Sequence, residues 1–218
     1  MIIYFIIFFL LISLSTYEFG YNSLRTNQTQ FYSNFLFKFT FIILLLFAGL
    51  RGANFGDYCA YWNIFEIVPS TFDYFVRERT IPRDVSTEFA FNFFIPMFVK
   101  NFTSNHVYYF LLTSFAALVI NFYAIRKMSP FFFLSLLIYF SHIFLYKELQ
   151  QMRSGISGAL VLLSVYFLSE KKTYSYLTVF LSAFLIHTTA FVSFFGVLSK
   201  LFFSNLKKKK IFLFLILI

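Results

Sequence analysis

The stretch LYKELQQMRSGISGALVLLSVYF, residues 145–167, decides the fold because it carries charged side chains into the start of a long apolar run. Arg153 lies where that run begins, and a guanidinium at the edge of a hydrocarbon span is costly unless it snorkels, pairs or faces a wet cavity. Arg153 is therefore the first candidate functional residue. The small residues Gly155, Ser157 and Gly158 follow it, and they predict close approach of a neighbouring helix or a lipid-borne ligand.

The composition of the whole chain points the same way. Its 218 residues are 60% hydrophobic and 12% charged and include 38 Phe, which no water-soluble domain of this size can hide in one core. The sequence therefore predicts an all-α fold, a polytopic transmembrane helical bundle that forms a single domain over residues 1–218. The net charge of +9 requires no nucleic-acid partner, because Lys and Arg collect in the cytoplasmic loops of membrane proteins.

About seven or eight apolar segments are predicted as membrane helices or parts of them. They are residues 2–17, 35–50, 89–99, 107–125, 131–146, 155–168 and 174–198, with a last run from Ile211 and a polar link at residues 18–33. A helix over 89–99 is only about 16 Å long, so either this run is re-entrant or 174–198 is a broken pair of helices. The last run reaches only Ile218, which predicts a C-terminally truncated chain whose further helices are missing.

Charge predicts the orientation of the chain. The loop at residues 51–88 holds six of the nine acidic residues and four of the eighteen basic ones. The positive-inside rule therefore makes it an external loop and makes the connections at 126–127, 171–172 and 207–210 cytoplasmic. The N-terminus is also expected on the cytoplasmic side.

The external loop opens with RGANFGDYCAYW, which holds several candidate residues. Asp57 can orient an arginine or take a proton from a sugar hydroxyl. The rings of Tyr58 and Tyr61 offer faces on which a sugar can stack. The alternative is an interfacial aromatic belt in which Arg51 and Asp57 pair at the lipid headgroups.

Two further ionisable residues lie in apolar surroundings. His187, in FLIHTTAFV, is suited to proton transfer or to a hydrogen bond with a ligand oxygen, and alternatively is a packing residue. Glu88 begins an apolar run and therefore needs a partner, for which Arg51 and Arg153 are the candidates. The single Cys59 and the absence of paired histidine motifs give no support for a metal site.

Taken in order, these motifs resemble the EpsG family, the Wzy-like polymerases of bacterial exopolysaccharide, capsule and O-antigen. The resemblance covers roughly residues 35–200. It is carried by Arg51, Gly56-Asp57-Tyr58 with Tyr61, Glu88, Gln150-x-x-Arg153 and His187-Thr188-Thr189-Ala190.

The resemblance implies a multi-pass glycosyltransferase of the cytoplasmic (inner) membrane that joins repeat units linked to undecaprenyl pyrophosphate. Guanidinium groups bind phosphate oxygens well, so Arg153 and Arg51 are expected to stabilise the leaving diphosphate. Asp57 or His187 is expected to take the acceptor proton. The catalytic set is therefore Arg153, Asp57 and His187, and the substrate-binding set is Arg51, Tyr58, Tyr61, Glu88 and Gln150.

No metal or other cofactor is required in this mechanism, since arginines supply the positive charge. The expected partners are the lipid-linked oligosaccharide, membrane lipids, a chain-length regulator and a flippase, with no nucleic acid. A flippase or exporter of lipid-linked glycans would use the same arginines, but the spans offer no continuous polar path. A membrane O-acyltransferase of polysaccharide would use the intramembrane histidine, and a structural subunit would leave Arg153 and His187 unexplained.

Overall fold

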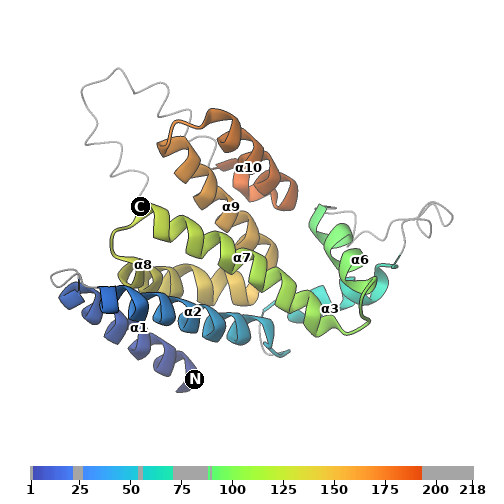
Figure 1. The fold of residues 1–218 in the computed structure, drawn as a ribbon. Coiled ribbons are helices and arrows are strands. Elements are labelled where there is room, and N and C mark those ends of the chain that lie inside the picture. The colour runs from blue at the N-terminus through green and yellow to red at the C-terminus, as the bar shows by residue number, and fades with distance from the viewer. Residues whose placement is uncertain (1, 22–26, 54–55, 71–87, 89, 193–218) are drawn as a thin grey trace.

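The structure is a computed structural model that describes residues 2–21, 27–53, 56–70, 88 and 90–192. Over these residues the protein is an all-α membrane helical bundle without strands, so the predicted fold class is confirmed (Figure 1). The middle of the predicted external loop, residues 71–87, lies outside the described part, as do Lys207 to Lys210 and the last apolar run.

The helices follow the apolar runs closely. They are α1 Ile2–Tyr21, α2 Asn27–Gly49, α3 Tyr58–Ile67, η1 Ala90–Phe94, α6 Ile95–Lys100, α7 His106–Met128, α8 Phe132–Tyr139, η2 Phe140–Glu148, α9 Met152–Ser169, α10 Thr173–Ile186 and η3 Thr188–Phe191. Among the described residues, α1, α7 and α9 are long and apolar enough to cross a membrane. Residues 34–49, 90–100 and 173–186 form shorter apolar helical stretches.

The predicted polar link at residues 18–33 is wrong at both ends, because α1 continues to Tyr21 and α2 begins at Asn27. Glu18 lies in the last turns of α1, and its carboxylate accepts hydrogen bonds from the backbone amides of Phe132 (2.7 Å) and Phe133 (2.9 Å). Those amides belong to the first turn of α8, where no intrahelical acceptor exists. Glu18 therefore caps α8 and ties the end of α1 to it.

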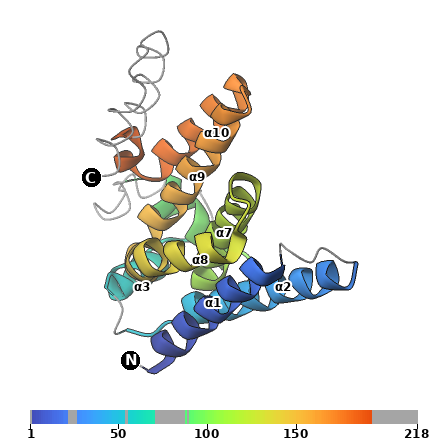
Figure 2. The same cartoon turned by 90° about the vertical axis from the view of Figure 1, so that its left-hand side faces the viewer.

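The described part of the bundle has two large hydrophobic cores that share α7, and a small third cluster around Tyr176 and Phe180 lies between α9 and α10. The first joins α7 to α1, α2, α8 and η2 around Leu118 and Phe122. The second joins the first half of α7 to α3, η1, α6 and the start of α9 around Tyr109 and Phe110. Helix α10 packs along α9, and the two views in Figures 1 and 2 show this pair beside α7.

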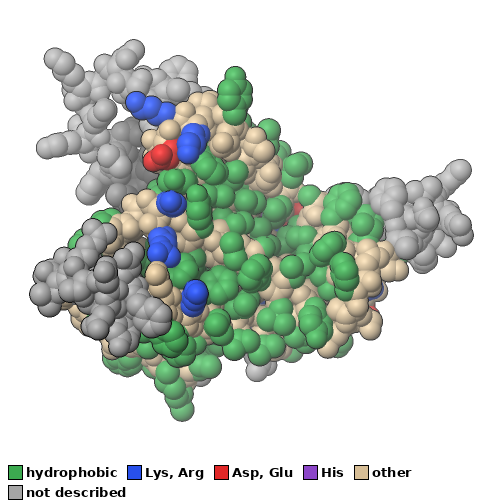
Figure 3. Space-filling model, viewed as in Figure 1, with side chains coloured by type: hydrophobic (Ala, Val, Ile, Leu, Met, Phe, Trp, Pro, Cys, Tyr) green, Lys and Arg blue, Asp and Glu red, His purple; other side chains and the backbone are tan. Residues whose placement is uncertain are grey.

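The helix ends gather at two ends of the bundle. At one, here named the Arg51 end, α2 and α10 finish and α3, α7 and α9 begin. At the other, named the Lys171 end, α7 finishes with Arg126 and Lys127, and Lys171 and Lys172 connect α9 to α10. Figure 3 shows the basic side chains of one face gathered along one edge.

This arrangement corrects the prediction for the N-terminus. Glu18 contacts the start of α8 at the Lys171 end, and α1 is one continuous helix, so Ile2 lies at the Arg51 end. The N-terminus and the predicted external loop are therefore on the same side. The sequence argument failed because α1 and α2 run in opposite directions and return the chain to the end of the bundle from which it started.

The short run near residue 90 does not cross the bundle. Lys100, at the end of α6, donates hydrogen bonds to the carbonyls of Glu66 (2.9 Å) and Val68 (2.5 Å), which close α3. The later run is broken too, because α10 ends at Ile186 and His187 has an extended backbone. The short run therefore packs against the end of α3, and the later run is interrupted at His187, with residues 193–198 outside the described part of the chain.

Candidate active site

Four side chains from separate elements meet at the Arg51 end, and we name them the Glu88 cluster. Glu88 Oε2 lies 2.7 Å from Arg153 Nη1, and Glu88 Oε1 contacts His187 Nδ1. Arg153 Nε donates a hydrogen bond of 3.2 Å to the hydroxyl oxygen of Tyr61. Of the two partners that the sequence suggested for Glu88, the structure has Arg153.

Two members of the cluster, Glu88 and His187, stand at irregularities of the backbone, and the other two stand on regular helices. Glu88 has a φ of 54°, a region that few residues other than glycine adopt, and its carbonyl accepts from the amides of Phe91 and Asn92 at the start of η1. His187 stands at the break between α10 and η3. Arg153 is the second residue of α9, so the first turn of a long helix fixes its direction.

The cluster is partly buried and partly exposed to solvent. The exposed fractions of its side chains are 28% for Arg153, 21% for His187 and 12% for Glu88. Partial burial strengthens an ion pair relative to one in water. A guanidinium carries five N–H donors; Nε donates to the Tyr61 hydroxyl oxygen, and Nη1 forms an ion pair with Glu88. Arg153 therefore keeps donors for an anion.

Tyr61 forms the floor of the cluster. Its side chain is buried, and the guanidinium carbon of Arg153 lies 5.6 Å from the centre of its ring. Burial raises the pKa of the Tyr61 hydroxyl, and the nearby Arg153 only partly opposes this effect. Tyr61 is thus a neutral phenol whose hydroxyl and ring position the guanidinium of Arg153.

The loop before α3 docks onto the residues before α9. The amide of Asp57 donates to the carbonyl of Gln150 over 3.2 Å. Gly56 has a φ of 30°, and a Cβ there would lie 2.8 Å from Cβ of Gln150, so the contact requires glycine. This backbone contact brings Asp57 and Gln150 together, and both side chains are exposed.

Tyr58 is oriented away from the Glu88 cluster. Its hydroxyl lies 3.0 Å from Nε2 of His106, and its ring stacks on Phe110 with the centres 4.6 Å apart. Both contacts are with the first turns of α7. Tyr58 therefore fastens α3 to α7 in this structure.

Arg51 is buried beneath this layer. Its Nη1 donates to the backbone carbonyl of Glu148, and its guanidinium carbon lies 4.9 Å from the centre of the Phe110 ring. Burial lowers the pKa of Arg51 to about 10, and the negative charge of Glu148 opposes the shift, so Arg51 stays cationic at neutral pH. Among the described residues, no contact joins Arg51 to Asp57 or Arg153.

Sequence reasoning did not identify a second polar group, which we name the buried network. The Glu148 Oε1 atom accepts from the Tyr139 hydroxyl (3.1 Å) and from Nδ2 of Asn121 (3.2 Å), and Asn121 also donates to Tyr139 (3.2 Å). The other carboxylate oxygen lies against Gly155, where a Cβ would approach it to 2.8 Å. The position of Glu148 five residues before Arg153 was the available signal.

Small residues after Arg153 have the role that the sequence suggested at two of three positions. Gly155 makes room for the Glu148 carboxylate, and Ser157 donates to the carbonyl of Ala183 over 3.1 Å where α9 meets α10. A Cβ at Gly158 would meet nothing within 4 Å. Close approach therefore occurs in the first turns of α9, next to the Glu88 cluster.

The fold and this site define a helical membrane protein with a charged cluster at one end of its bundle. The sequence profile of the EpsG family matches residues 34–218, and the chain belongs to that family. The amylovoran biosynthesis protein AmsC of Erwinia amylovora is 28% identical over 145 residues, which are 63% of this chain and 36% of that protein. No solved structure matches the chain.

Proposed function

We propose that the protein acts in the synthesis of a bacterial polysaccharide, as a polymerase in the cytoplasmic membrane. It would join repeat units carried on undecaprenyl pyrophosphate at the outer face. Membership of the EpsG family and the similarity to an amylovoran biosynthesis protein support this role. The observation that carries the proposal is the Glu88 cluster, which combines a fixed cation with a paired imidazole at the Arg51 end.

The reaction breaks the bond between the anomeric carbon of the growing glycan and its lipid diphosphate. A hydroxyl oxygen of the next repeat unit forms the new bond to that carbon. Negative charge develops on the diphosphate as it leaves, and a pre-positioned cation stabilises such charge. Arg153 has this role in our proposal, because Glu88 and Tyr61 fix its orientation and leave other donors available.

The acceptor hydroxyl must lose a proton, and we assign that proton to His187. Glu88 contacts Nδ1 of the imidazole, which favours the tautomer with its hydrogen on that atom and leaves Nε2 as the base. Asp57 and Gln150 lie at the exposed edge of the same region and would contact the acceptor sugar. Glu88 then orients both catalytic residues instead of binding substrate directly.

Arg51 has a different place in this proposal from the one that the sequence suggested. Its guanidinium is buried and contacts the end of η2 and the ring of Phe110. We assign it to the positioning of the residues before α9. The diphosphate is thus held by Arg153, and Arg51 supports the segment that presents it.

The position of the basic residues supports the sidedness of the proposal. The connections at Arg126-Lys127 and Lys171-Lys172 lie at the end opposite the Glu88 cluster. The positive-inside rule then assigns the cluster to the outer face.

The test is Arg153→Lys in a strain that depends on this gene for its polysaccharide. Lysine keeps the charge but loses the planar set of donors, so we expect polymer to be lost while the protein still inserts in the membrane. Lys172→Arg, a cation exchange at the other end, is the control and should keep full polymer. Polymer of normal length from the Arg153→Lys strain would overturn the assignment.

The same strains separate a polymerase from an exporter. Loss of a polymerase leaves single lipid-linked repeat units exposed at the outer face. Loss of an exporter leaves them on the cytoplasmic side, where an impermeant glycan-oxidising reagent cannot reach them. Accumulation on the cytoplasmic side would exclude the polymerase proposal.

A further inference from the structure

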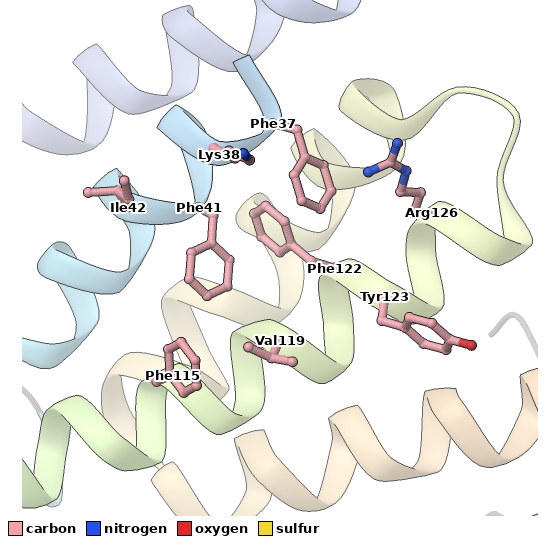
Figure 4. Close-up of a pocket in the computed structure, with 9 residues that line it drawn as sticks. All are labelled: Phe37, Lys38, Phe41, Ile42, Phe115, Val119, Phe122, Tyr123 and Arg126. Carbon is pink, nitrogen blue, oxygen red and sulfur yellow. The ribbon is translucent and has the colours of Figure 1, made fainter. Parts of the chain in front are cut away.

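A groove on the membrane face of the bundle lies between α2 and α7, far from the Glu88 cluster. Its volume is about 460 Å³, within the range of about 300–1,000 Å³ that small-molecule sites occupy. Figure 4 shows its walls, with Phe41 and Ile42 on α2 and Phe115 and Val119 on α7. Lys38 and Arg126 stand at one end of it, the Lys171 end.

The groove exists because the two helices are packed closely at one end and held apart by aromatic rings at the other. At Gly49 a Cβ would lie 2.4 Å from Cδ2 of Leu111, so the helices touch there. Further along, Phe41 meets Phe115 and Phe122 edge to face, with ring centres 5.8 and 5.2 Å apart. These rings fix the walls, so the groove is formed before any ligand arrives.

The walls of the groove are apolar, and they are also exposed. Ile42 is 53% exposed and Phe115 is 47% exposed, although both line the groove. Surfaces of this kind take hydrocarbon in preference to water. The occupant must therefore present a chain of apolar carbon along α2 and α7.

The mouth of the groove is cationic. Arg126 donates to Oδ1 of Asn34 over 3.2 Å, and its guanidinium carbon lies 4.8 Å from the centre of the Phe37 ring, which holds it at the opening. Among the described residues, neither Lys38 nor Arg126 forms an ion pair with a carboxylate. Two positive charges at the end of an apolar groove complement an anionic headgroup on an acyl chain.

We propose that this groove binds an anionic phospholipid, with one acyl chain between α2 and α7 and its phosphate at Lys38 and Arg126. The apolar walls require the acyl chain. The two cations, Lys38 and Arg126, select a headgroup with net negative charge over a zwitterionic one. The inference stands whether or not the polymerase proposal is correct, since it uses no residue of the Glu88 cluster.

The experiment is native mass spectrometry of the purified full chain in detergent, with phosphatidylglycerol or phosphatidylcholine added. The wild type should retain phosphatidylglycerol preferentially. The double variant Lys38→Gln with Arg126→Gln should reduce that preference about tenfold, since each cation near a membrane surface contributes modestly to the binding of anionic lipid. The charge-conserving double variant Lys38→Arg with Arg126→Lys should keep the wild-type preference for phosphatidylglycerol.

The matched control removes two cations at the same end but outside the groove, by Lys171→Gln with Lys172→Gln. An equal loss in this control would mean that general surface charge attracts the lipid, and would overturn the site. Competition by soluble glycerol phosphate at equal concentration would also overturn it, because a headgroup alone would then be sufficient.

A groove-filling variant tests the acyl chain separately. Val119→Trp leaves both cations in place and should abolish retention of phosphatidylglycerol, and it decides the matter should the charge variants fail to fold. Unchanged retention would overturn the proposal. A wild-type dimer that this variant converts to monomer, with no lipid bound in either, would show instead that a second copy occupies the groove.

Discussion

Two glutamates at the Arg51 end differ in almost every respect except residue type. Glu88 is partly exposed and contacts two side chains that can carry positive charge, Arg153 and His187. Glu148 is buried, and the side chains that its carboxylate contacts are the neutral donors Asn121 and Tyr139.

This difference distinguishes a candidate for catalysis, the Glu88 cluster, from a group that stabilises the fold, the buried network. In the proposed mechanism a cation must stabilise charge on the substrate, and Arg153 of the Glu88 cluster is the partly exposed cation assigned to this role. A carboxylate within a bundle needs hydrogen-bond donors, and the buried network provides two of them, Asn121 and Tyr139, to Oε1 of Glu148. The two groups are linked through α9, whose first turn holds both Arg153 and Gly155.

The largest expected effect comes from Glu88→Gln. The amide is nearly isosteric but neutral, so Arg153 loses its ion pair and the tautomer of His187 is no longer fixed. Polymer formation should fall about 10²- to 10³-fold, as for loss of a positioned catalytic group. The yield and length of polymer, divided by the amount of protein in the membrane, are the measurement. A fall of less than threefold would remove Glu88 from the site.

Glu148→Ala should act on stability instead. It leaves the Asn121 amide and the Tyr139 hydroxyl buried without their acceptor and opens a cavity, at a cost of about 3 kcal/mol. We expect a lower midpoint of thermal unfolding in detergent and less protein in the membrane. Polymer per folded molecule should stay near that of the wild type. A normal midpoint with no polymer would instead place Glu148 among the catalytic groups.

The sequence alone singled out the residues of the Glu88 cluster as candidates. It identified almost nothing of the buried network. Arg153, His187 and Glu88 were found because each is an ionisable residue in or beside an apolar run, and such residues need a cause. Asn121 and Tyr139 are each one of several polar or hydroxyl-bearing residues on α7 and α8, and uncharged residues of this kind often hydrogen-bond across helices, so neither stands out in the sequence. The packing of α7 against η2 brings Asn121 to Glu148, and Tyr139 reaches it from the end of α8, which continues directly into η2.

The same contrast holds for the fold. Apolar length predicted the long helices α1, α7 and α9 well, because hydrocarbon thickness sets that length. Apolar length was a weaker guide to the break at His187 and to the placement of η1 beside α3. Those features depend on contacts between distant segments, such as Lys100 with the carbonyls that close α3.

Gly155→Ala sharpens the comparison at the point where the two groups meet. Its Cβ would lie 2.8 Å from Oε2 of Glu148, which is closer than real carbon atoms come, so the carboxylate or the turn must shift. Overpacking of this kind costs about 1–2 kcal/mol. We expect a moderate fall in the unfolding midpoint and a partial loss of polymer, because Arg153 moves with the turn.

Gly158→Ala is the matched control for that substitution. A Cβ at Gly158 would meet nothing within 4 Å, and alanine favours the helix, so this variant should be as stable as the wild type or slightly more so. Equal destabilisation by both substitutions would mean that the Glu148 contact is not the cause.

Tyr61→Phe is the mildest change and the finest test of how Arg153 is positioned. Phenylalanine keeps the ring beneath the guanidinium and removes only the hydroxyl that accepts from Arg153 Nε. A hydrogen bond between a charged and a neutral group contributes about 1.5 kcal/mol, so polymer formation should fall about tenfold while Glu88 still holds Nη1. In a variant that already carries Glu88→Gln, Tyr61→Phe should lower polymer formation by a smaller factor than it does alone, because Glu88 and Tyr61 both fix the guanidinium of Arg153. Fully additive losses in this double-mutant cycle would show that Tyr61 acts on something other than the orientation of Arg153.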